Sequence, residues 1–299
     1  MVVEGAELLS VALEAGAPVE SVYVAPEGRD HPAVVEVSAR AFEAGSRVFD
    51  LGPGVLERVA DTVTPQPVLA VVGFESPDLS VLRGTDLVVV CADVRDPGNA
   101  GTLIRTADAA GAGGVVCCDG TVDPYNPKTV RASAGSVFHL PVVAGGETVS
   151  VVETLGAWGL RTLGTVVRDG VDYADVNLTG PVALIFGNEA SGLGAEVLEV
   201  LDATVTIPMA GRAESLNVSV SAAVLCFEVL RQRRKSEPGQ RGASEPGQRG
   251  TSGQDEQRTD PGASRSTMPE MEARPVGEMT TRTETTEPGT EPTDGGTAS

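Results

Sequence analysis

The chain has 299 residues, an apolar content of 41% and a formal net charge of −20. This length holds one large or two ordinary domains, and the acidic balance excludes a protein that grips nucleic acid over its whole surface, although it permits a local basic patch. The sequence has no apolar run of about eighteen residues and no basic, cleavable N-terminal segment, so we expect a cytoplasmic protein without a membrane span.

The cysteines and histidines argue against disulfides, metal sites and histidine-based catalysis. The cysteines lie in apolar runs such as LVVVC, where reduced thiols behave as small buried hydrophobes. Cys117 and Cys118 should point to opposite faces of one strand, and no CxxC or His-rich spacing occurs. His31 and His139 have no nucleophile beside them in a polar cluster. We therefore expect no bound metal.

The order of segments predicts an α/β protein with two domains. Residues 1–75 alternate helical and strand-like segments, which is typical of a small α/β domain. Residues 76–85 contain proline and few apolar side chains, so we expect a linker there. Residues 86–235 contain nearly continuous apolar strands such as VALIF, which indicate a parallel sheet buried on both faces.

The last segment, residues 236–299, consists mainly of Glu, Pro, Gly, Thr, Ser and Gln and contains the tandem repeat SEPGQRGA and SEPGQRGT. It has too few apolar side chains to bury a core, so we expect it to be disordered. A tail that binds a specific partner is the alternative.

Three polar clusters follow apolar strands, at residues 94–101, 187–194 and 209–217. Because ligands of parallel α/β sheets bind beyond the carboxyl ends of the strands, these clusters mark a candidate site by their position. In the first cluster we expect Asn99 and Gly101 at a turn and Arg105 about one helical turn further on, pointing back toward the strand ends. The glycine-rich dinucleotide pattern GxGxxG is absent.

Each of the other two clusters also has an ordinary structural explanation. Glu189 could pair with an arginine or cap the helix that follows it. Ser215 and Asn217 lie where a helix begins, and Ser and Asn are common helix caps. Taken alone, either cluster would favour a cap.

Together the three clusters resemble the three motifs of the SpoU/TrmH class of SPOUT RNA 2′-O-ribose methyltransferases. The matching residues are Asn99, Gly101, Arg105, Ala107 and Gly111 in the first motif, Gly187, Asn188, Glu189, Gly192 and Leu193 in the second, and Ile207, Pro208, Met209, Gly211, Ser215, Leu216, Asn217, Val218 and Ser219 in the third. The resemblance covers about residues 1–234. It implies a trefoil-knotted methyltransferase domain, in residues 86–235, preceded by an L30e-like RNA-binding domain in residues 1–75.

The resemblance also implies S-adenosylmethionine as the cofactor. The residues that it assigns to cofactor binding are Gly187, Ile207, Met209 and Leu216. The residues that it assigns to catalysis are Arg105, Glu189, Ser215 and Asn217, with Asn99 supporting them. In this family an arginine placed like Arg105 is proposed to orient and deprotonate the ribose hydroxyl. Because arginine is normally always charged, its role as a base stays open.

The expected partners are RNA and a second copy of the chain. Ribosomal RNA is favoured because the N-terminal domain resembles those of rRNA-directed members, and tRNA is the alternative. We expect a homodimer through residues 222–230, AAVLCFEVL, with Leu225 and Val229 in the interface, because this helix is apolar on more than one face. Arginines from both subunits would then form a local cluster for RNA, which the sequence suggests would include Arg95, Arg105, Arg131 and Arg212.

Two other classes of function compete with this hypothesis. One is a catalytically inactive RNA-binding descendant, which has no need to keep Arg105, Glu189, Ser215 and Asn217 together. The other is a nucleotide-binding α/β enzyme of another kind, which should show GxGxxG and a downstream acid for the ribose. The sequence favours the methyltransferase on both counts.

Overall fold

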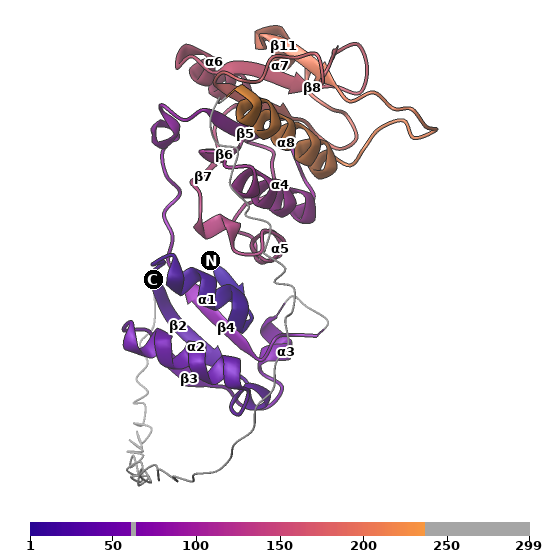
Figure 1. Ribbon diagram of the computed structural model, residues 1–299. Coiled ribbons are helices and arrows are strands. Elements are labelled where there is room, and N and C mark those ends of the chain that lie inside the picture. The colour runs from indigo at the N-terminus through magenta and orange to yellow at the C-terminus, as the bar shows by residue number, and fades with distance from the viewer. Residues whose placement is uncertain (61–63, 237–299) are drawn as a thin grey trace, which may run out of the picture. The chain divides into compact units, whose positions relative to one another are not determined.

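Two β-sheets organise the chain in the computed structural model, which describes residues 1–60 and 64–236 (Figure 1). The first sheet has four strands and the second has seven. The segment predicted to be disordered lies outside the described residues, except for Ser236 at the end of the last helix.

The N-terminal sheet is mixed, with strand order β1-β4-β2-β3. Its strands are β1 (Val2–Glu4), β2 (Val19–Val24), β3 (Arg47–Asp50) and β4 (Val68–Val72), and its helices are α1 (Ala6–Glu14), α2 (Pro32–Glu43) and α3 (Leu56–Val59). Strand β4 runs antiparallel to β1 and β2, whereas β2 and β3 are parallel. Alternate residues of the strands, such as Val22 and Val24, join the apolar side chains of α1 and α2 in one core.

The second sheet is parallel throughout and has the order β7-β6-β5-β10-β8-β11-β9. Its strands are β5 (Leu87–Cys91), β6 (Gly114–Cys117), β7 (Val142–Ala144), β8 (Arg161–Thr165), β9 (Val171–Asp172), β10 (Val182–Phe186) and β11 (Ala203–Thr206). The predicted α/β fold with a buried parallel sheet is therefore confirmed.

Helices cover both faces of the seven-stranded sheet (Figure 1). One core includes side chains of α4 (Pro97–Ala109), α5 (Pro127–Ala132) and α8 (Val218–Ser236), and the other includes side chains of α6 (Thr148–Ala157) and α7 (Ala195–Val200). Cys117 and Cys118 fall in opposite cores, as predicted. In the described ranges, no helix is long and apolar enough to cross a bilayer.

Short 3-10 turns complete the described structure. They are η1 (Pro26–Gly28), η2 (Leu79–Leu82) and η3 (Ser136–Phe138). The turn η2 lies in the segment predicted as a linker, and Arg83 directly after it places its guanidinium 4.7 Å from the centre of the Trp158 ring. This cation–π contact ties the segment to the end of α6.

The placement of the first motif differs from the prediction in one respect. Asn99 and Gly101 lie inside α4 and not in a turn before it. The helix begins early because Pro97 suits the first helical position, and Asp96 caps the helix by accepting a hydrogen bond from the Asn99 backbone N–H at 2.8 Å. The predicted motif glycine Gly111 lies beyond the helix, where its φ of 75° suits the residue after a helix end.

Gly101 allows α4 and α5 to approach closely. A Cβ atom at this position would lie 2.5 Å from the Ala132 Cβ and 2.5 Å from the Thr129 carbonyl oxygen. The Thr129 oxygen is part of the α5 backbone, and the Ala132 Cβ is bonded directly to it. Neither atom can move aside as the end of a long side chain could. Gly101 thus fixes the position of the helix that carries Asn99.

We expect Gly101→Ala to lower the free energy of unfolding by up to about 2 kcal/mol, because an overpacking cost of about 1–3 kcal/mol is only partly offset by the roughly 1 kcal/mol that alanine gains over glycine inside a helix. The matched control is Gly156→Ala in α6, where an added Cβ meets one atom at 3.9 Å, so only the helical gain should remain. Urea unfolding of both variants measures the difference. Equal stabilisation by the two substitutions would contradict this account.

Candidate active site

The loops that follow β5, β10 and β11 line one pocket of about 700 Å³, a size typical of small-molecule sites. Every predicted site residue except Arg105 lines it. These residues are Asn99, Gly187, Glu189, Ile207, Met209, Ser215, Leu216 and Asn217. The structure therefore brings three segments that are far apart in the sequence to the carboxyl edge of the parallel sheet.

Glu189 joins the loop after β10 to the start of α4. Its carboxylate accepts hydrogen bonds from the Asn99 side-chain amide at 3.0 Å and from the backbone N–H groups of Arg95 at 3.4 Å and Asp96 at 3.3 Å. Glu189 does not cap the helix that follows it, whose N-cap residue is Gly194, so that explanation is wrong. Among the described residues, its hydrogen bonds come from a side-chain amide and from backbone N–H groups and not from an arginine side chain. It binds the N-terminal end of a helix that begins about ninety residues earlier in the sequence.

These contacts set the protonation state of Glu189. Partial burial alone would raise the pKa of the carboxyl group, but the hydrogen bonds from Asn99 and from the backbone outweigh burial and lower the pKa below its usual value. Glu189 is therefore ionised at neutral pH and acts as a pure hydrogen-bond acceptor.

The network continues from Asn99 to the third loop. The Asn99 side-chain oxygen accepts a hydrogen bond from the Asn217 amide at 2.9 Å. The Asn217 oxygen in turn accepts from the Ser219 backbone N–H at 2.9 Å and from the Ser219 hydroxyl at 2.6 Å. Asn217 therefore caps α8 and at the same time binds Asn99 in the pocket. Its explanation as a helix cap and its prediction as a site residue are compatible.

The order of donors and acceptors in this network follows from the charge on Glu189. A carboxylate only accepts, so the Asn99 amide must turn its NH2 group to Glu189 and its oxygen to Asn217. Asn217 must then present its own NH2 group to Asn99 and its oxygen to Ser219. Glu189 thus determines the orientation of both carboxamides.

Three residues of the network were not predicted as site residues. Ser219 binds Asn217, and Asn188 binds the loop after β5 by donating to the Asp93 backbone oxygen at 3.0 Å and to the Asp93 carboxylate at 3.1 Å. Ser219 and Asn188 both match motif positions, but Asn188 and its partner Asp93 are 95 positions apart, so no local pattern indicates their contact. Asp93 carried no signal, because a positive φ of 63° cannot be read from an aspartate in a sequence.

Arg105 lies apart from this cluster. It is exposed on α4 and does not line the pocket. Being six residues after Asn99, it lies about 9 Å further along the helix axis. Its predicted catalytic role stays a prediction.

The residues of the pocket fit S-adenosylmethionine. Leu193, Ile207, Met209 and Leu216 supply an apolar wall suited to an adenine ring, and Glu214 supplies a carboxylate suited to the positive charges of the cofactor. The loop after β10, which also lines the pocket, turns so tightly that a Cβ on Gly187 would lie 2.5 Å from the backbone of Gly192. Within residues 1–60 and 64–236, no three His, Cys, Asp or Glu side chains are grouped to hold a metal ion.

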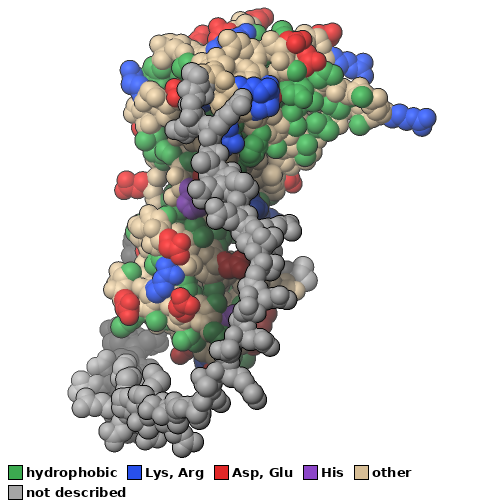
Figure 2. All heavy atoms as spheres, in the orientation of Figure 1, with side chains coloured by type: hydrophobic (Ala, Val, Ile, Leu, Met, Phe, Trp, Pro, Cys, Tyr) green, Lys and Arg blue, Asp and Glu red, His purple; other side chains and the backbone are tan. Residues whose placement is uncertain are grey.

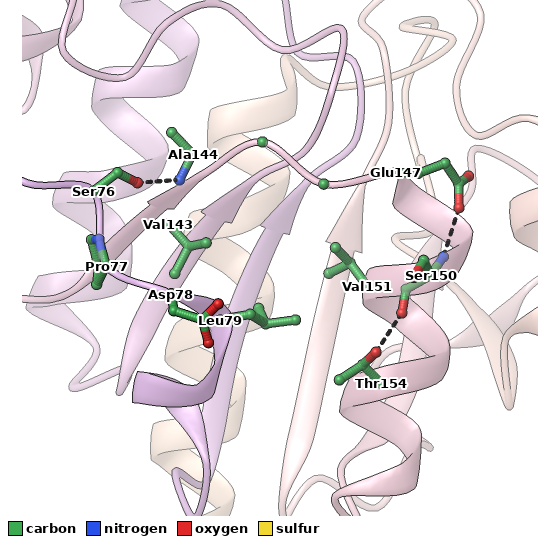
Figure 3. Close-up of a pocket in the computed structure, with 12 residues that line it drawn as sticks. Ser76, Pro77, Asp78, Leu79, Val143, Ala144, Glu147, Ser150, Val151 and Thr154 are labelled. Carbon is green, nitrogen blue, oxygen red and sulfur yellow. Dashed lines mark hydrogen bonds between the residues drawn. The ribbon is translucent and has the colours of Figure 1, made fainter.

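A second pocket of about 500 Å³ lies at the end of β7, and none of the predicted site residues lines it (Figure 3). Its polar groups are already engaged. The Ser76 hydroxyl accepts from the Ala144 N–H, the Glu147 carboxylate caps α6, and the Asp78 carboxylate accepts from the Ser80 N–H. This pocket therefore offers few free groups to a ligand, and the pocket that holds Glu189 is the candidate active site.

Comparisons with known proteins agree with this assignment. Residues 86–227 match the SpoU rRNA Methylase family, and residues 1–70 match the MRM3-like substrate binding domain. A 23S rRNA guanosine 2′-O-methyltransferase of Bacillus subtilis is 38% identical over 76% of this chain and 87% of its own length. A 23S rRNA guanosine 2′-O-methyltransferase of Pseudomonas syringae is 35% identical over 69% of this chain and 86% of its own length.

Solved structures show the same relationship. The SpoU methyltransferase AviRb from Streptomyces viridochromogenes, in complex with S-adenosylmethionine, is 32% identical and superposes with a TM-score of 0.71 over 79% of this chain and 91% of its own. An S-adenosylmethionine-bound rRNA methyltransferase from Sinorhizobium meliloti is 33% identical, with a TM-score of 0.67 over 77% of this chain and 86% of its own. With its fold, its motif residues and these relatives in agreement, the chain belongs to the SpoU rRNA methylase family.

Proposed function

We propose that this SpoU-family enzyme transfers a methyl group from S-adenosylmethionine to a ribose 2′-hydroxyl of 23S rRNA. The observation that carries the proposal is the hydrogen-bond network of Glu189, Asn99 and Asn217, which joins three loops around one pocket at the carboxyl edge of the sheet. The names of the relatives from Bacillus subtilis and Pseudomonas syringae support 23S rRNA as the substrate, and tRNA is the alternative.

The chemistry requires few catalytic groups but accurate placement. The cofactor supplies a methyl group on a positively charged sulfur. A bond forms between the ribose oxygen and the methyl carbon, the bond between sulfur and carbon breaks, the sulfur keeps the electron pair, and the hydroxyl proton leaves. The protein must therefore align the hydroxyl behind the methyl group and give its proton a route out.

We assign these tasks to the predicted residues as follows. Asn99 and Asn217 orient the ribose, because the carboxylate of Glu189 fixes the direction of both side-chain amides. Glu189 itself is a poor base, since its hydrogen bonds lower its pKa. Ser215 lines the pocket and is exposed, so its hydroxyl can reach a substrate. Arg105 lies outside the pocket on an exposed part of α4, and we propose that it holds an RNA phosphate and orients the attacking hydroxyl once RNA is bound, as its family counterpart is proposed to do.

The N-terminal domain, in residues 1–75, is proposed to hold the RNA substrate, with residues 76–85 as the linker to the methyltransferase domain in residues 86–235. The match of residues 1–70 to a substrate binding domain supports this role. On the surface visible in Figure 2, Lys and Arg side chains are scattered among Asp and Glu. A protein with a net charge of −20 must therefore bind RNA through a local group of arginines and through shape.

Two further parts of the proposal follow from the family. We infer that the segment leading into α8 forms the trefoil knot, which is supported by its hydrogen bond to the first helix of the domain, α4, through Asn217 and Asn99. We also infer that the protein works in the cytoplasm, where ribosomal RNA is found. The proposed substrate, 23S rRNA, supports this location.

Mapping ribose methylation in a deletion strain tests the substrate assignment. We expect one 2′-O-methyl group of 23S rRNA to disappear on deletion and to return when the full chain is expressed from a plasmid. The matched control is the Asn99→Ala variant at equal abundance, which should fail to restore the mark because the ribose loses its orienting group. Loss of a tRNA mark with all 23S rRNA marks intact would overturn the choice of RNA.

The homodimer is also a proposal, and α8 supports it. Val220 is 48% exposed, Val224 is partly exposed and Phe227 is 47% exposed. These residues are spaced by four and three positions, so they form one apolar stripe along the helix. Leu216, which lines the pocket and is 36% exposed, lies just before the helix. A partner on this stripe would therefore lie beside the active site, and a second copy of the chain is the partner that the family implies.

The structure corrects the residues predicted for this interface. Leu225 and Val229 are each 1% exposed and belong to the core of their own chain. An apolar pattern on several faces of a helix cannot show which face contacts its own sheet. The exposed stripe of Val220, Val224 and Phe227 takes their place in the proposal.

We expect Val220→Glu combined with Phe227→Glu to yield a folded monomer with weakened methyl transfer, because two charges would have to be buried in the interface. Phe42→Glu on α2 is the matched control, since Phe42 is 69% exposed and lies in the other domain. Sedimentation velocity and methyl transfer to 23S rRNA measure the outcome. A monomeric wild-type protein, or a monomeric variant with full activity, would refute the proposal.

A further inference from the structure

Asp93 has an unusual backbone conformation beside the active site. It lies two residues after β5 and has a φ of 63°, in the left-handed region that costs energy for residues other than glycine and is tolerated best by Asn and Asp. Its side chain is 35% exposed. The neighbouring Gly120 leaves room for it, because a Cβ there would lie 2.8 Å from an Asp93 carboxylate oxygen.

The two oxygens of the Asp93 carboxylate hold two different segments. Oδ2 accepts a hydrogen bond from the Asn188 amide at 3.1 Å, and the Asp93 backbone oxygen accepts from the same amide at 3.0 Å. Oδ1 accepts from the Arg95 Nε at 2.8 Å. One strained residue thus connects the loop after β10 with an arginine at the rim of the site.

The bond to Asn188 acts on the cofactor side of the pocket. With its amide held by Asp93, the Asn188 oxygen accepts from the backbone N–H groups of Ala190 at 2.9 Å and Ser191 at 3.1 Å. These bonds fold the segment from Gly187 to Gly192, which lines the pocket and carries Glu189. Loss of the Asp93 carboxylate would therefore loosen the wall that the cofactor contacts.

The bond to Arg95 acts on the RNA side. The Arg95 side chain is 72% exposed, and its Nε is engaged by Asp93. The two terminal nitrogens of the guanidinium lie beyond this bond, and they are the pair that binds a phosphate in bidentate geometry. The backbone N–H of Arg95 also donates to Glu189, so the main chain of the arginine lies beside the network of Glu189, Asn99 and Asn217.

We propose that Asp93 is a positioning residue with two separable functions: through Asn188 it shapes the cofactor loop, and through Arg95 it presents a guanidinium to a phosphate of the RNA substrate. This inference rests on the proposed methyl transfer to RNA. It explains why a strained aspartate occupies a position where glycine would be free of strain, because glycine has no carboxylate to hold either segment.

Two substitutions that tolerate positive φ separate the two functions. Asp93→Asn keeps one oxygen for Asn188 but offers no acceptor to Arg95, because its other group is an NH2. Asp93→Gly removes both bonds of the carboxylate and leaves Asn188 only the backbone oxygen of residue 93. Glycine is free of strain at this φ and asparagine tolerates it as well as aspartate does, so both variants of the full chain should fold. The Kd for S-adenosylmethionine is measured by calorimetry without RNA, and the Kd for a 23S rRNA transcript by fluorescence anisotropy without the cofactor.

We expect Asp93→Asn to weaken RNA binding about tenfold and to leave cofactor binding near the wild-type value, which corresponds to the loss of one charge-assisted contact. Asp93→Gly should weaken both about tenfold. Arg95→Ala should match Asp93→Asn in RNA affinity, and the double variant Asp93→Asn, Arg95→Ala should be no weaker than either, because both changes remove the same contact.

Two results would overturn the inference. One is a folded Asp93→Gly variant with wild-type affinity for S-adenosylmethionine, and the other is additive losses of RNA affinity for Asp93→Asn and Arg95→Ala. Failure of the proposed function is distinguishable, because it would appear in the wild-type protein as an absence of methyl transfer to 23S rRNA. The cofactor titration of Asp93→Gly would still report on the Asn188 function in that case.

Discussion

The site depends on one carboxylate that accepts hydrogen bonds from a distant helix. Glu189 receives the Asn99 side chain and two backbone N–H groups that precede α4, and these bonds hold the loop after β10 against the loop after β5. Because a carboxylate only accepts, it also decides how Asn99 and Asn217 are oriented. A single ionised group therefore fixes both the distance between the loops and the direction of every donor along the network.

The fold places this carboxylate where it is needed. The seven strands run parallel, so the loops after β5, β10 and β11 leave the sheet at the same edge and can share one pocket. Close packing reinforces the arrangement, since Gly101 lets α5 press against α4 and Gly187 lets its loop fold back on Gly192. A methyl transfer that needs alignment more than acid or base groups is well served by such a rigid edge.

Much of this could be predicted from the sequence, because the relevant signals are local. Continuous apolar strands predicted the buried parallel sheet, and the polar clusters after them predicted which loops meet. The partners could not be predicted, because Glu189 and Asn99 are ninety positions apart and only the fold brings them together. The sequence also does not indicate which face of α8 contacts its own sheet, or that the backbone of Asp93 has a positive φ.

Replacing Glu189 by glutamine probes the role of this carboxylate, because the change keeps the size of the side chain and replaces an ionised group that only accepts by a neutral amide that also donates. We expect Glu189→Gln to stay folded and to bind S-adenosylmethionine, but its kcat for methyl transfer should fall about 100-fold, since the misdirected carboxamides no longer align the ribose. A folded Glu189→Gln enzyme with the wild-type kcat would contradict this role of Glu189.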